Sequence, residues 1–221
     1  MTMAFERIDA QFRKLTVDEL NAWRSIAPAV ASDCMNRTQV MNSTIKSISS
    51  GAILCGQART VTTMVGDCAS VCELISMALP GEIVVVDAGG VEDTAVWGGI
   101  MTEEAVQRGI GGAVVYGAIR DVADMRELGF NMFCKAIVPR GPHHGFGGVI
   151  DGPIAVAGAV VRPGDIVLGN DDGVVVVPLE RASEVLAAAQ AHIAKEVDWI
   201  AAIRRGQTIQ DVFNFSKSHV R

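Results

Sequence analysis

The sequence has no apolar stretch approaching the ~18 residues that a membrane-spanning helix requires, although 49% of its 221 residues are hydrophobic. Residues 1–15 are interrupted by charged side chains and lack the apolar core of a signal peptide. We therefore expect a soluble, cytoplasmic protein with no membrane partner.

Positive charge is also scarce, because 19 Lys and Arg face 25 Asp and Glu and the formal net charge is −6. The basic residues are scattered along the chain, whereas nucleic acid is bound by clustered positive faces. This pattern argues against a nucleic-acid partner. A small anion remains possible, since one arginine and a helix N-terminus can bind it.

The five cysteines are an odd number and follow no disulfide-framework spacing. Cys68 and Cys72 are four residues apart in a predicted helix, so that both thiols could lie on one face. No second Cys or His pair at zinc-ligand spacing accompanies them, and we predict no zinc site. We interpret the cysteines as small buried thiols in a reducing compartment.

Helix and strand signals alternate through the middle of the chain, which predicts parallel βαβ units. The apolar run at 83–87 is typical of a strand covered on both faces. We predict strands over 51–64, 83–87, 113–119 and 132–138, and helices over 67–79, 99–108 and 121–128.

The two ends of the chain have a different character. A capping box of Thr16 and Glu19 predicts a helix that runs to about Ala31, and a short second helix is expected over 32–37. Beyond Pro139, short apolar runs separated by Gly, Pro and Asp indicate antiparallel strands at 154–157, 159–161, 166–168 and 174–177. An apolar stripe predicts a final helix over 179–205. Because no linker divides the chain, we expect one α/β domain over 1–221, a layered sandwich with a parallel βαβ core and an antiparallel β segment.

The most informative segment begins at Gly98 and Gly99, which open a predicted helix. The first N–H groups of a helix lack internal partners, so a ligand carboxylate could accept hydrogen bonds there. Arg120 follows the strand 113–119, at the edge where α/β sheets bind ligands, and its guanidinium suits a carboxylate. With Asp121 and Asp124, this segment could hold a small α-keto acid against a divalent metal.

Each of these residues also has a structural interpretation. The two glycines could form a plain turn. Asp121 is expected at the N-cap of the next helix, where Asp ordinarily stabilises by roughly 1 kcal/mol, and Asp124 is an ordinary acid for a first helical turn. The combination in this context, rather than any single residue, favours a functional site.

Long ordered blocks make the sequence similar to one known family. It resembles the family that joins the regulator of ribonuclease activity A with the 4-hydroxy-4-methyl-2-oxoglutarate and 4-carboxy-4-hydroxy-2-oxoadipate aldolases. The matching blocks are 80–87, 109–112, 120–121, 139–142, 163–167 and 171–178.

The resemblance implies a role for each matching position. It implies that the backbone at Gly98, Gly99, Ile100 and Met101 binds the pyruvyl carboxylate, that Arg120 contacts the substrate, and that Asp121 anchors Mg²⁺ or Mn²⁺. Asp124 would hold the metal through water, as would Glu196 from a neighbouring subunit's C-terminal helix. It further implies a swivelling-type β/β/α sandwich and a homotrimer or hexamer.

Other residues could be mistaken for a site. We assign His143 and His144, in the glycine-rich loop 140–148, to the surface or the substrate rim, and we reject His192 as a metal ligand. Lys135 could form a Schiff base if its pKa were lowered by burial, but a structural role is favoured. For the run from Asn170 to Gly173 we prefer a hairpin turn over a cation loop.

Three functions remain open on the sequence alone. The first is a metal-dependent aldolase that cleaves a 4-hydroxy-2-oxo acid to pyruvate and a second oxo acid, with oxaloacetate decarboxylation as a side activity. The second is a non-enzymatic regulator that binds and inhibits a ribonuclease. The third is a lyase of the same metal-enolate type with an unrelated physiological substrate.

Overall fold

The computed structural model describes residues 5–216, 218 and 219. Its strands are β1 (Phe5–Arg7), β2 (Lys46–Ser47), β3 (Leu54–Thr63), β4 (Ile83–Asp87), β5 (Ala95–Trp97), β6 (Gly112–Ile119), β7 (Met132–Ile137), β8 (Gly148–Ile150), β9 (Ile154–Val156), β10 (Ala159–Val161), β11 (Ile166–Asn170) and β12 (Gly173–Val177). Its helices are α1 (Val17–Arg24), α2 (Pro28–Cys34), α3 (Ala69–Met77), α4 (Gly99–Gln107), α5 (Val122–Glu127), the 3₁₀ turn η1 (Leu179–Arg181), α6 (Ala182–Arg204) and α7 (Ile209–Phe213).

The main sheet has a parallel core. β3, β4, β6 and β7 lie side by side in that order, and each neighbouring pair is parallel, as the alternation of helix and strand signals predicts. β3 also pairs antiparallel with β8 and β11, and β11 pairs antiparallel with β12. The predicted α/β class, with a parallel core and an antiparallel segment, is confirmed.

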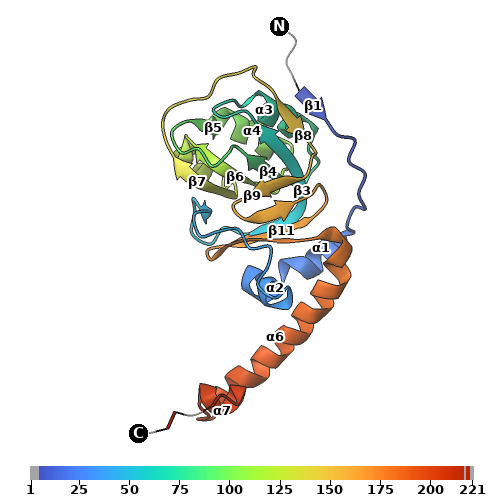
Figure 1. Cartoon of the computed structure of the whole chain (residues 1–221), viewed down its shortest axis with the longest axis vertical. Coiled ribbons are helices and arrows are strands. Elements are labelled where there is room, and N and C mark those ends of the chain that lie inside the picture. The colour runs from blue at the N-terminus through green and yellow to red at the C-terminus, as the bar shows by residue number, and fades with distance from the viewer. Residues whose placement is uncertain (1–4, 217, 220–221) are drawn as a thin grey trace.

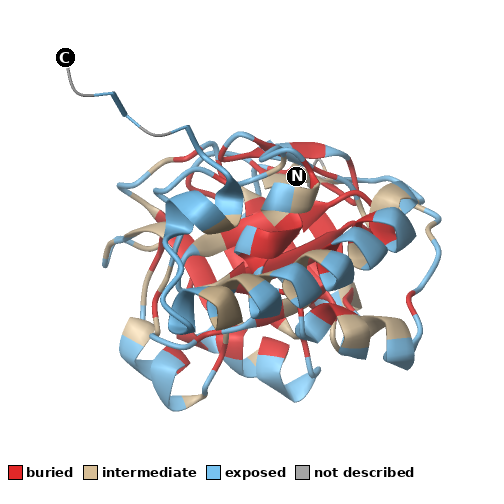
Figure 2. Cartoon of the chain, turned by 90° about the horizontal axis from the view of Figure 1, so that it is seen from below, coloured by how far each residue is buried: buried red, intermediate tan, exposed pale blue. Residues whose placement is uncertain are grey.

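Successive side chains of β4 alternate between two hydrophobic cores, which explains its continuous apolar run. Val84 and Val86 pack beneath α3, α4 and α5, whereas Ile83 and Val85 face β9, β11 and β12. A third core joins α1, α2 and α6 to the outer face of β11 and β12. The elements are therefore layered (Figure 1), and buried residues gather in the strands while exposed residues lie on the surrounding helices (Figure 2).

The N-terminal helix is shorter than predicted. The capping box of Thr16 and Glu19 is present and begins α1, but α1 ends at Arg24. Pro28 begins α2, because its ring would clash with the carbonyl of Arg24 in a continuous helix. The predictions of a helix to Ala31 and of a separate helix over 32–37 are therefore wrong.

Helix α6 is long and only partly packed. Val185 and Ala189 are buried in the third core, where α6 packs against α2, whereas Val197 and Ile200 are exposed. Figure 1 shows its C-terminal part projecting away from the sheet. Within the described residues, no helix combines the length and apolar character needed to cross a bilayer.

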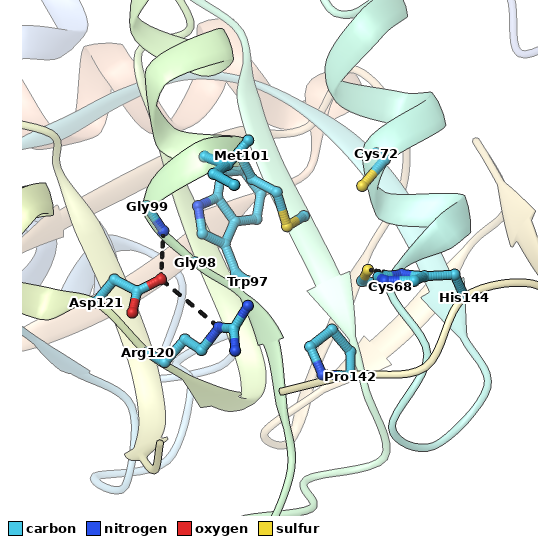
Figure 3. Close-up of a pocket in the computed structure, with 11 residues that line it drawn as sticks. Cys68, Cys72, Trp97, Gly98, Gly99, Met101, Arg120, Asp121, Pro142 and His144 are labelled. Carbon is cyan, nitrogen blue, oxygen red and sulfur yellow. Dashed lines mark hydrogen bonds and ion pairs between the residues drawn. The ribbon is translucent and has the colours of Figure 1, made fainter. Parts of the chain in front are cut away.

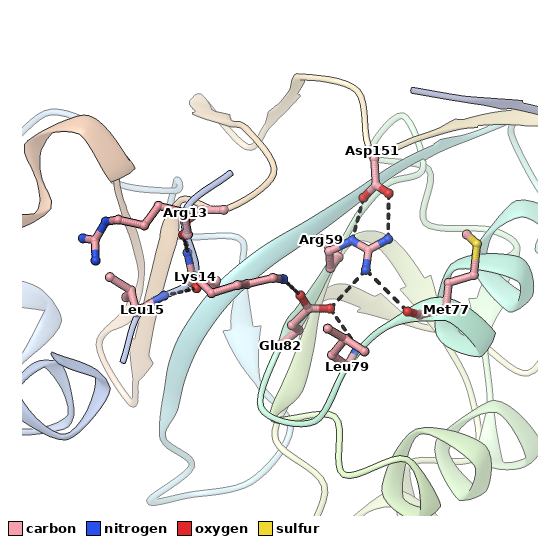
Figure 4. A network of polar contacts seen from close by, with 10 residues as sticks. Arg13, Lys14, Leu15, Arg59, Met77, Leu79, Glu82 and Asp151 are labelled. Atoms are coloured by element: carbon pink, nitrogen blue, oxygen red, sulfur yellow. Dashed lines mark hydrogen bonds and ion pairs between the residues drawn. The ribbon is translucent and has the colours of Figure 1, made fainter. Parts of the chain in front are cut away.

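A buried ion network ties the N-terminal segment to the sheet (Figure 4). The Arg59 guanidinium on β3 lies 2.6 Å from Asp151 Oδ2 and 3.1 Å from Glu82 Oε2. Lys14 pairs with the other carboxylate oxygen of Glu82. These contacts join 5–16, β3 and the loops before β4 and after β8.

Candidate active site

The short strand β5 places the start of α4 beside the end of β6. The two strands are parallel, with Trp97 opposite Ile119, and the backbone N–H of Arg120 donates to Trp97 O at 3.0 Å. Gly98 and Gly99 therefore lie next to Arg120 and Asp121 at the edge where α/β sheets bind ligands. Strand β5 is not predictable from the sequence, because three residues are too few to show the alternation of a strand.

Asp121 has an unusual backbone and an unusual contact. Its φ of 61° is left-handed, a region that few residues other than glycine adopt. It occupies the predicted N-cap position of α5, but its side chain makes no capping hydrogen bond there. Its Oδ2 instead accepts a hydrogen bond of 2.9 Å from the N–H of Gly99. The capping interpretation is therefore wrong, and such strain is characteristic of functional sites.

Glycine is required at several positions because functional side chains approach the backbone closely. A Cβ on Gly98 would lie 2.7 Å from Asp121 Oδ2, and one on Gly99 would lie 3.0 Å from Asp124 Oδ2. A Cβ on Gly141 would lie 2.5 Å from Arg120 Nη1. The loop after β7 thus makes room for Arg120.

The first turn of α4 presents two backbone donors. Gly99 N–H is taken by Asp121, and Thr102 N–H begins the helical pattern by donating to Gly98 O at 3.1 Å. The N–H groups of Ile100 and Met101 precede the first helical partner. They are positioned to donate to an anion at the positive end of the helix dipole.

A pocket of about 240 Å³ opens beside these donors. Figure 3 shows Arg120 and Asp121 on one side and Cys68, Cys72 and His144 on the other. Arg120 Nε lies 3.6 Å from Asp121 Oδ2, and 41% of the Arg120 side chain is exposed, which leaves the guanidinium accessible to an anion.

A second cavity, of about 510 Å³, lies on the other side of Asp121. It shares Asp121, Gly99 and Ile100 with the first pocket, so these residues separate the two spaces. Its further acidic lining residues are Glu103, Asp124 and Glu127.

The donor types of this second cavity fit a hard divalent cation. Carboxylate and water oxygens are the ligands that Mg²⁺ and Mn²⁺ prefer. Among the described residues, no group of three or more His, Cys, Asp or Glu side chains is arranged to hold a metal. A cation beside Asp121 would therefore use few protein ligands and complete its shell with water and ligand oxygens, as Mg²⁺ commonly does.

Cys68 and Cys72 interact across the first turn of α3. Cys68 Sγ lies 3.2 Å from His144 Nδ1. The hydrogen bond from Cys68 lowers the pKa of Cys72, whereas the same contact and burial raise the pKa of Cys68. The prediction of buried thiols is confirmed for Cys68 and Cys134. It is wrong for Cys72, which is exposed, and Cys34 and Cys55 are only partly buried.

The remaining candidate residues have other contacts. Lys135 Nζ donates to Gly90 O at 2.7 Å and lies 2.9 Å from Glu92 Oε1, which supports its structural interpretation. Asp172 lies in the tight turn between β11 and β12, so the predicted hairpin is confirmed. His192 lies 3.4 Å from Glu196 within α6.

The histidine pair divides between two environments. His143 packs edge-on against Phe146, with ring centroids 6.0 Å apart, whereas His144 lines the pocket. Four further residues line the pocket without having been predicted from the sequence, namely Cys68, Cys72, Trp97 and Pro142. Their shared position depends on the packing of α3 and of the loop after β7 against α4, which no local motif encodes.

Comparison with known proteins agrees with this architecture. The model of the family described as RraA-like, Aldolase/RraA, matches residues 28–176. The chain belongs to the RraA-like family. A 4-hydroxy-4-methyl-2-oxoglutarate aldolase of Thermus thermophilus is 31% identical over 147 residues, which cover 66% of this chain and 89% of that protein. A Halalkalibacterium halodurans protein whose name proposes the same aldolase activity is 34% identical over 180 residues, which cover 81% of this chain and 86% of that protein.

Solved structures of family members have the same fold. An uncharacterized protein from Pseudomonas syringae superposes with a TM-score of 0.81 at 25% identity and covers 94% of this chain and 99% of its own. The RNA-processing inhibitor RraA from Thermus thermophilus superposes with a TM-score of 0.63 at 30% identity. The match covers 68% of this chain and 92% of the inhibitor. The family thus contains proteins named as aldolases and proteins named as inhibitors.

Proposed function

We propose that this RraA-like protein is a divalent-metal-dependent carbon–carbon lyase that cleaves a 4-hydroxy-2-oxo acid to pyruvate and a second oxo acid. Oxaloacetate decarboxylation is the expected side activity. The proposal depends above all on the position of the Asp121 carboxylate. The backbone of Asp121 is left-handed, and its side chain does not cap α5 but accepts a hydrogen bond from Gly99 N–H. Asp121 thereby lines both cavities. The names of the aldolase relatives support the same reaction class.

The residues of the pocket suit the α-keto acid end of such a substrate. Its carboxylate would accept hydrogen bonds from the N–H groups of Ile100 and Met101 and pair with the guanidinium of Arg120. Because these groups are fixed on α4 and at the end of β6, they orient the C3–C4 bond before it breaks.

Bond cleavage leaves an electron pair on C3, so negative charge develops on the keto oxygen of pyruvate and must be stabilised there. A magnesium or manganese ion held by Asp121, with Asp124 contributing through water, would supply that stabilisation when bound. Arg120 adds a fixed positive charge on the pocket side. Decarboxylation of oxaloacetate generates the same charge, which is why one site would serve both reactions.

We also infer that the site is completed in a homotrimer or hexamer. Glu196 lies on α6, whose C-terminal part projects away from the sheet (Figure 1). We propose that its carboxylate contributes to another copy's site, through water, as the family resemblance implies. Ile100, whose side chain is 88% exposed beside Asp121, would be covered by such a neighbour.

The proposal is tested by mixing the protein with oxaloacetate, 4-hydroxy-4-methyl-2-oxoglutarate or 4-carboxy-4-hydroxy-2-oxoadipate and Mg²⁺ or Mn²⁺. We expect pyruvate release that EDTA abolishes and that added metal restores. Absence of turnover with every oxo acid would overturn the proposal and favour the alternative of a non-enzymatic regulator that binds and inhibits a ribonuclease. The Thermus thermophilus structure is named as an RNA-processing inhibitor.

A further inference from the structure

Two thiols line the pocket on the side opposite Arg120 (Figure 3). Cys68 is the N-cap of α3, and the N–H of Cys72, one turn later, donates to Cys68 O at 3.0 Å. Residues four apart lie on one face of a helix, so both side chains reach the same pocket. The proposed cleavage of an oxo acid uses neither thiol.

The two thiols differ in exposure. Cys68 is 3% exposed, whereas Cys72 is exposed, so a reagent in solvent reaches Cys72 more easily. Cys134 is buried, and Cys34 and Cys55 are only partly buried. None of these three lines the pocket. Cys72 therefore combines accessibility with a position beside the candidate active site.

A chain of hydrogen bonds ends at the sulfur of Cys72. Cys68 Sγ lies 3.2 Å from His144 Nδ1, and the Cys68 thiol is also hydrogen-bonded to Cys72. A thiol has a single proton. When Cys68 donates that proton to Cys72, His144 must donate to Cys68 from Nδ1. The chain then stabilises the thiolate of Cys72, which is the nucleophilic form of cysteine.

The carboxylates nearest to Cys72 are already engaged. The hydrogen bond from Cys68 has the largest effect on the pKa of Cys72, and it lowers this pKa. Burial opposes the effect, as do the carboxylates of Glu104 and Asp67. However, Glu104 Oε1 lies 2.8 Å from Arg108 Nε, and both oxygens of Asp67 accept backbone hydrogen bonds. The net effect lowers the pKa of Cys72.

We propose that Cys72 is a modification site for low-molecular-weight disulfides, and that the mixed disulfide closes the pocket beside Arg120. The pocket of about 240 Å³ is lined by Cys72, by Arg120 and by the start of α4. Such a volume admits a small molecule but not a protein. A group attached to Cys72 Sγ takes up space that a ligand of Arg120 would occupy.

The reaction is a thiol–disulfide exchange. The thiolate of Cys72 attacks one sulfur of the disulfide, a new S–S bond forms, and the original S–S bond breaks. The second half of the reagent leaves with the electron pair and takes up a proton. One disulfide is consumed for each one formed, and the incoming disulfide is the oxidant. An excess of free thiol reverses the exchange.

The modification is tested by incubating the full chain with glutathione disulfide and following each cysteine by peptide mass spectrometry. We expect Cys72 to be modified at least about tenfold faster than Cys34, because accessibility and thiolate character both favour it. Dithiothreitol should restore the free thiol. Modification of Cys34 at the same rate as Cys72 would overturn the proposal.

Variants of Cys68 test the chain of hydrogen bonds. Cys68→Ala removes the donor and should slow the modification of Cys72 by roughly threefold, because a smaller thiolate fraction is partly offset by a more nucleophilic thiolate. Cys68→Ser keeps a donor and should keep most of the rate. Equal rates in the wild type and in Cys68→Ala would refute this role of Cys68.

Closure of the pocket is tested by labelling Arg120 with phenylglyoxal, since 41% of its side chain is exposed. Glutathione on Cys72 should slow this labelling by at least about tenfold, because the attached group fills the pocket. Arg37, whose side chain is 74% exposed and lies outside the pocket lining, is the internal reference. In Cys72→Ser, treatment with glutathione disulfide should leave the labelling unchanged relative to the untreated variant. Equal labelling of Arg120 before and after modification of the wild type would refute closure.

The effect on catalysis rests on the proposed function, whereas the modification does not. Calorimetric titration with pyruvate and Mg²⁺ should show binding at least about tenfold weaker after modification, with recovery in dithiothreitol. If the unmodified chain does not bind pyruvate, the lyase proposal fails, and the two labelling experiments still decide this inference. If modified and unmodified chains bind pyruvate equally tightly, closure is refuted and the lyase proposal stands.

Discussion

The carboxylate of Asp121 lies between an apolar pocket and an acidic cavity. In the proposed reaction its negative charge is essential, because it would hold the metal ion, whereas its size matters less. Its Oδ2 accepts from Gly99 N–H, while the residue keeps a φ of 61°. Asparagine has nearly the same shape and tolerates the left-handed region. The substitution Asp121→Asn therefore separates charge from conformation.

We expect Asp121→Asn to lower kcat/KM for oxaloacetate and for the aldol substrate by roughly 10³-fold, because the stabilisation of developing negative charge is lost. The melting temperature should change by only a few degrees, since this side chain does not cap α5. Asp121→Ala should lose activity equally. Steady-state kinetics and thermal melts check this, and an active Asn variant would show that the carboxylate is not needed.

The thiols should differ sharply in reactivity. The contact with Cys68 lowers the pKa of the exposed Cys72, whereas burial raises the pKa values of Cys55 and Cys134 to about 11. Iodoacetamide at pH 8 should therefore alkylate Cys72 first, because the thiolate is the nucleophile. Peptide mass spectrometry over time checks the order, and equal labelling in denaturant is the control. Faster labelling of Cys134 than of Cys72 would contradict the structure.

At the scale of elements, the pairing of β5 with β6 brings the start of α4 to Asp121. This arrangement leaves no space for a side chain at Gly98, where a Cβ would lie 2.7 Å from Asp121 Oδ2 and 3.2 Å from Arg120 Nε. The two charged side chains and the helix start therefore form one rigid unit.

Gly98→Ala should reduce kcat/KM by about 10²-fold, because displacement of Asp121 and Arg120 by several tenths of an ångström misplaces the reacting groups. Gly152→Ala is the matched control, since its Cβ would meet only side-chain carbons of Ile8 and Val149, at 3.2 and 3.3 Å. Kinetics on both variants check this. Equal activity of the two variants would refute the close packing at Gly98.

We expect the ion network around Arg59 to stabilise the folded state and to take no part in catalysis. Arg59 is 7% exposed and joins Glu82 and Asp151. Arg59→Met leaves the buried carboxylate of Asp151 without its ion-pair partner and leaves Glu82 paired with Lys14 alone. We expect it to cost about 3–5 kcal/mol of unfolding free energy. Urea denaturation measures the loss, and the folded fraction should keep its KM for oxaloacetate. A loss below ~1 kcal/mol would mean that water replaces the guanidinium.

At the scale of the whole molecule, the sequence predicts most helices and strands well, but it predicts poorly where helices break and which elements pack against each other. β4 is predictable because its apolar run alternates between two cores. The break before Pro28 was missed because the capping box and the apolar residues suggest one continuous helix. The residues from Gly98 to Asp124 were found by motif. The opposite lining of the pocket, formed by Cys68, Cys72, Pro142 and His144, was not predicted, because it depends on how α3 packs beside α4 and on the path of the loop after β7.

The fold should also lose stability at alkaline pH. Because burial raises the pKa values of Cys55 and Cys134 from 9.0 to about 11, the folded chain keeps thiol protons that the unfolded chain releases. The free energy of unfolding should therefore fall as the pH rises from about 9 to about 11. Urea denaturation across this range checks the slope. The double variant Cys55→Ala/Cys134→Ala should show a shallower fall, and an unchanged slope would contradict the assignment.

The role of Asp121 in metal-dependent stabilisation of the carbanion is tested by the exchange of pyruvate methyl protons in D₂O, followed by proton NMR with the full chain and Mg²⁺. We expect the methyl signal to decay, EDTA to stop the decay, and Asp121→Asn to slow it by roughly 10³-fold. A decay rate equal to that of protein-free buffer, or one unaffected by Asp121→Asn, would show that Asp121 does not have this role.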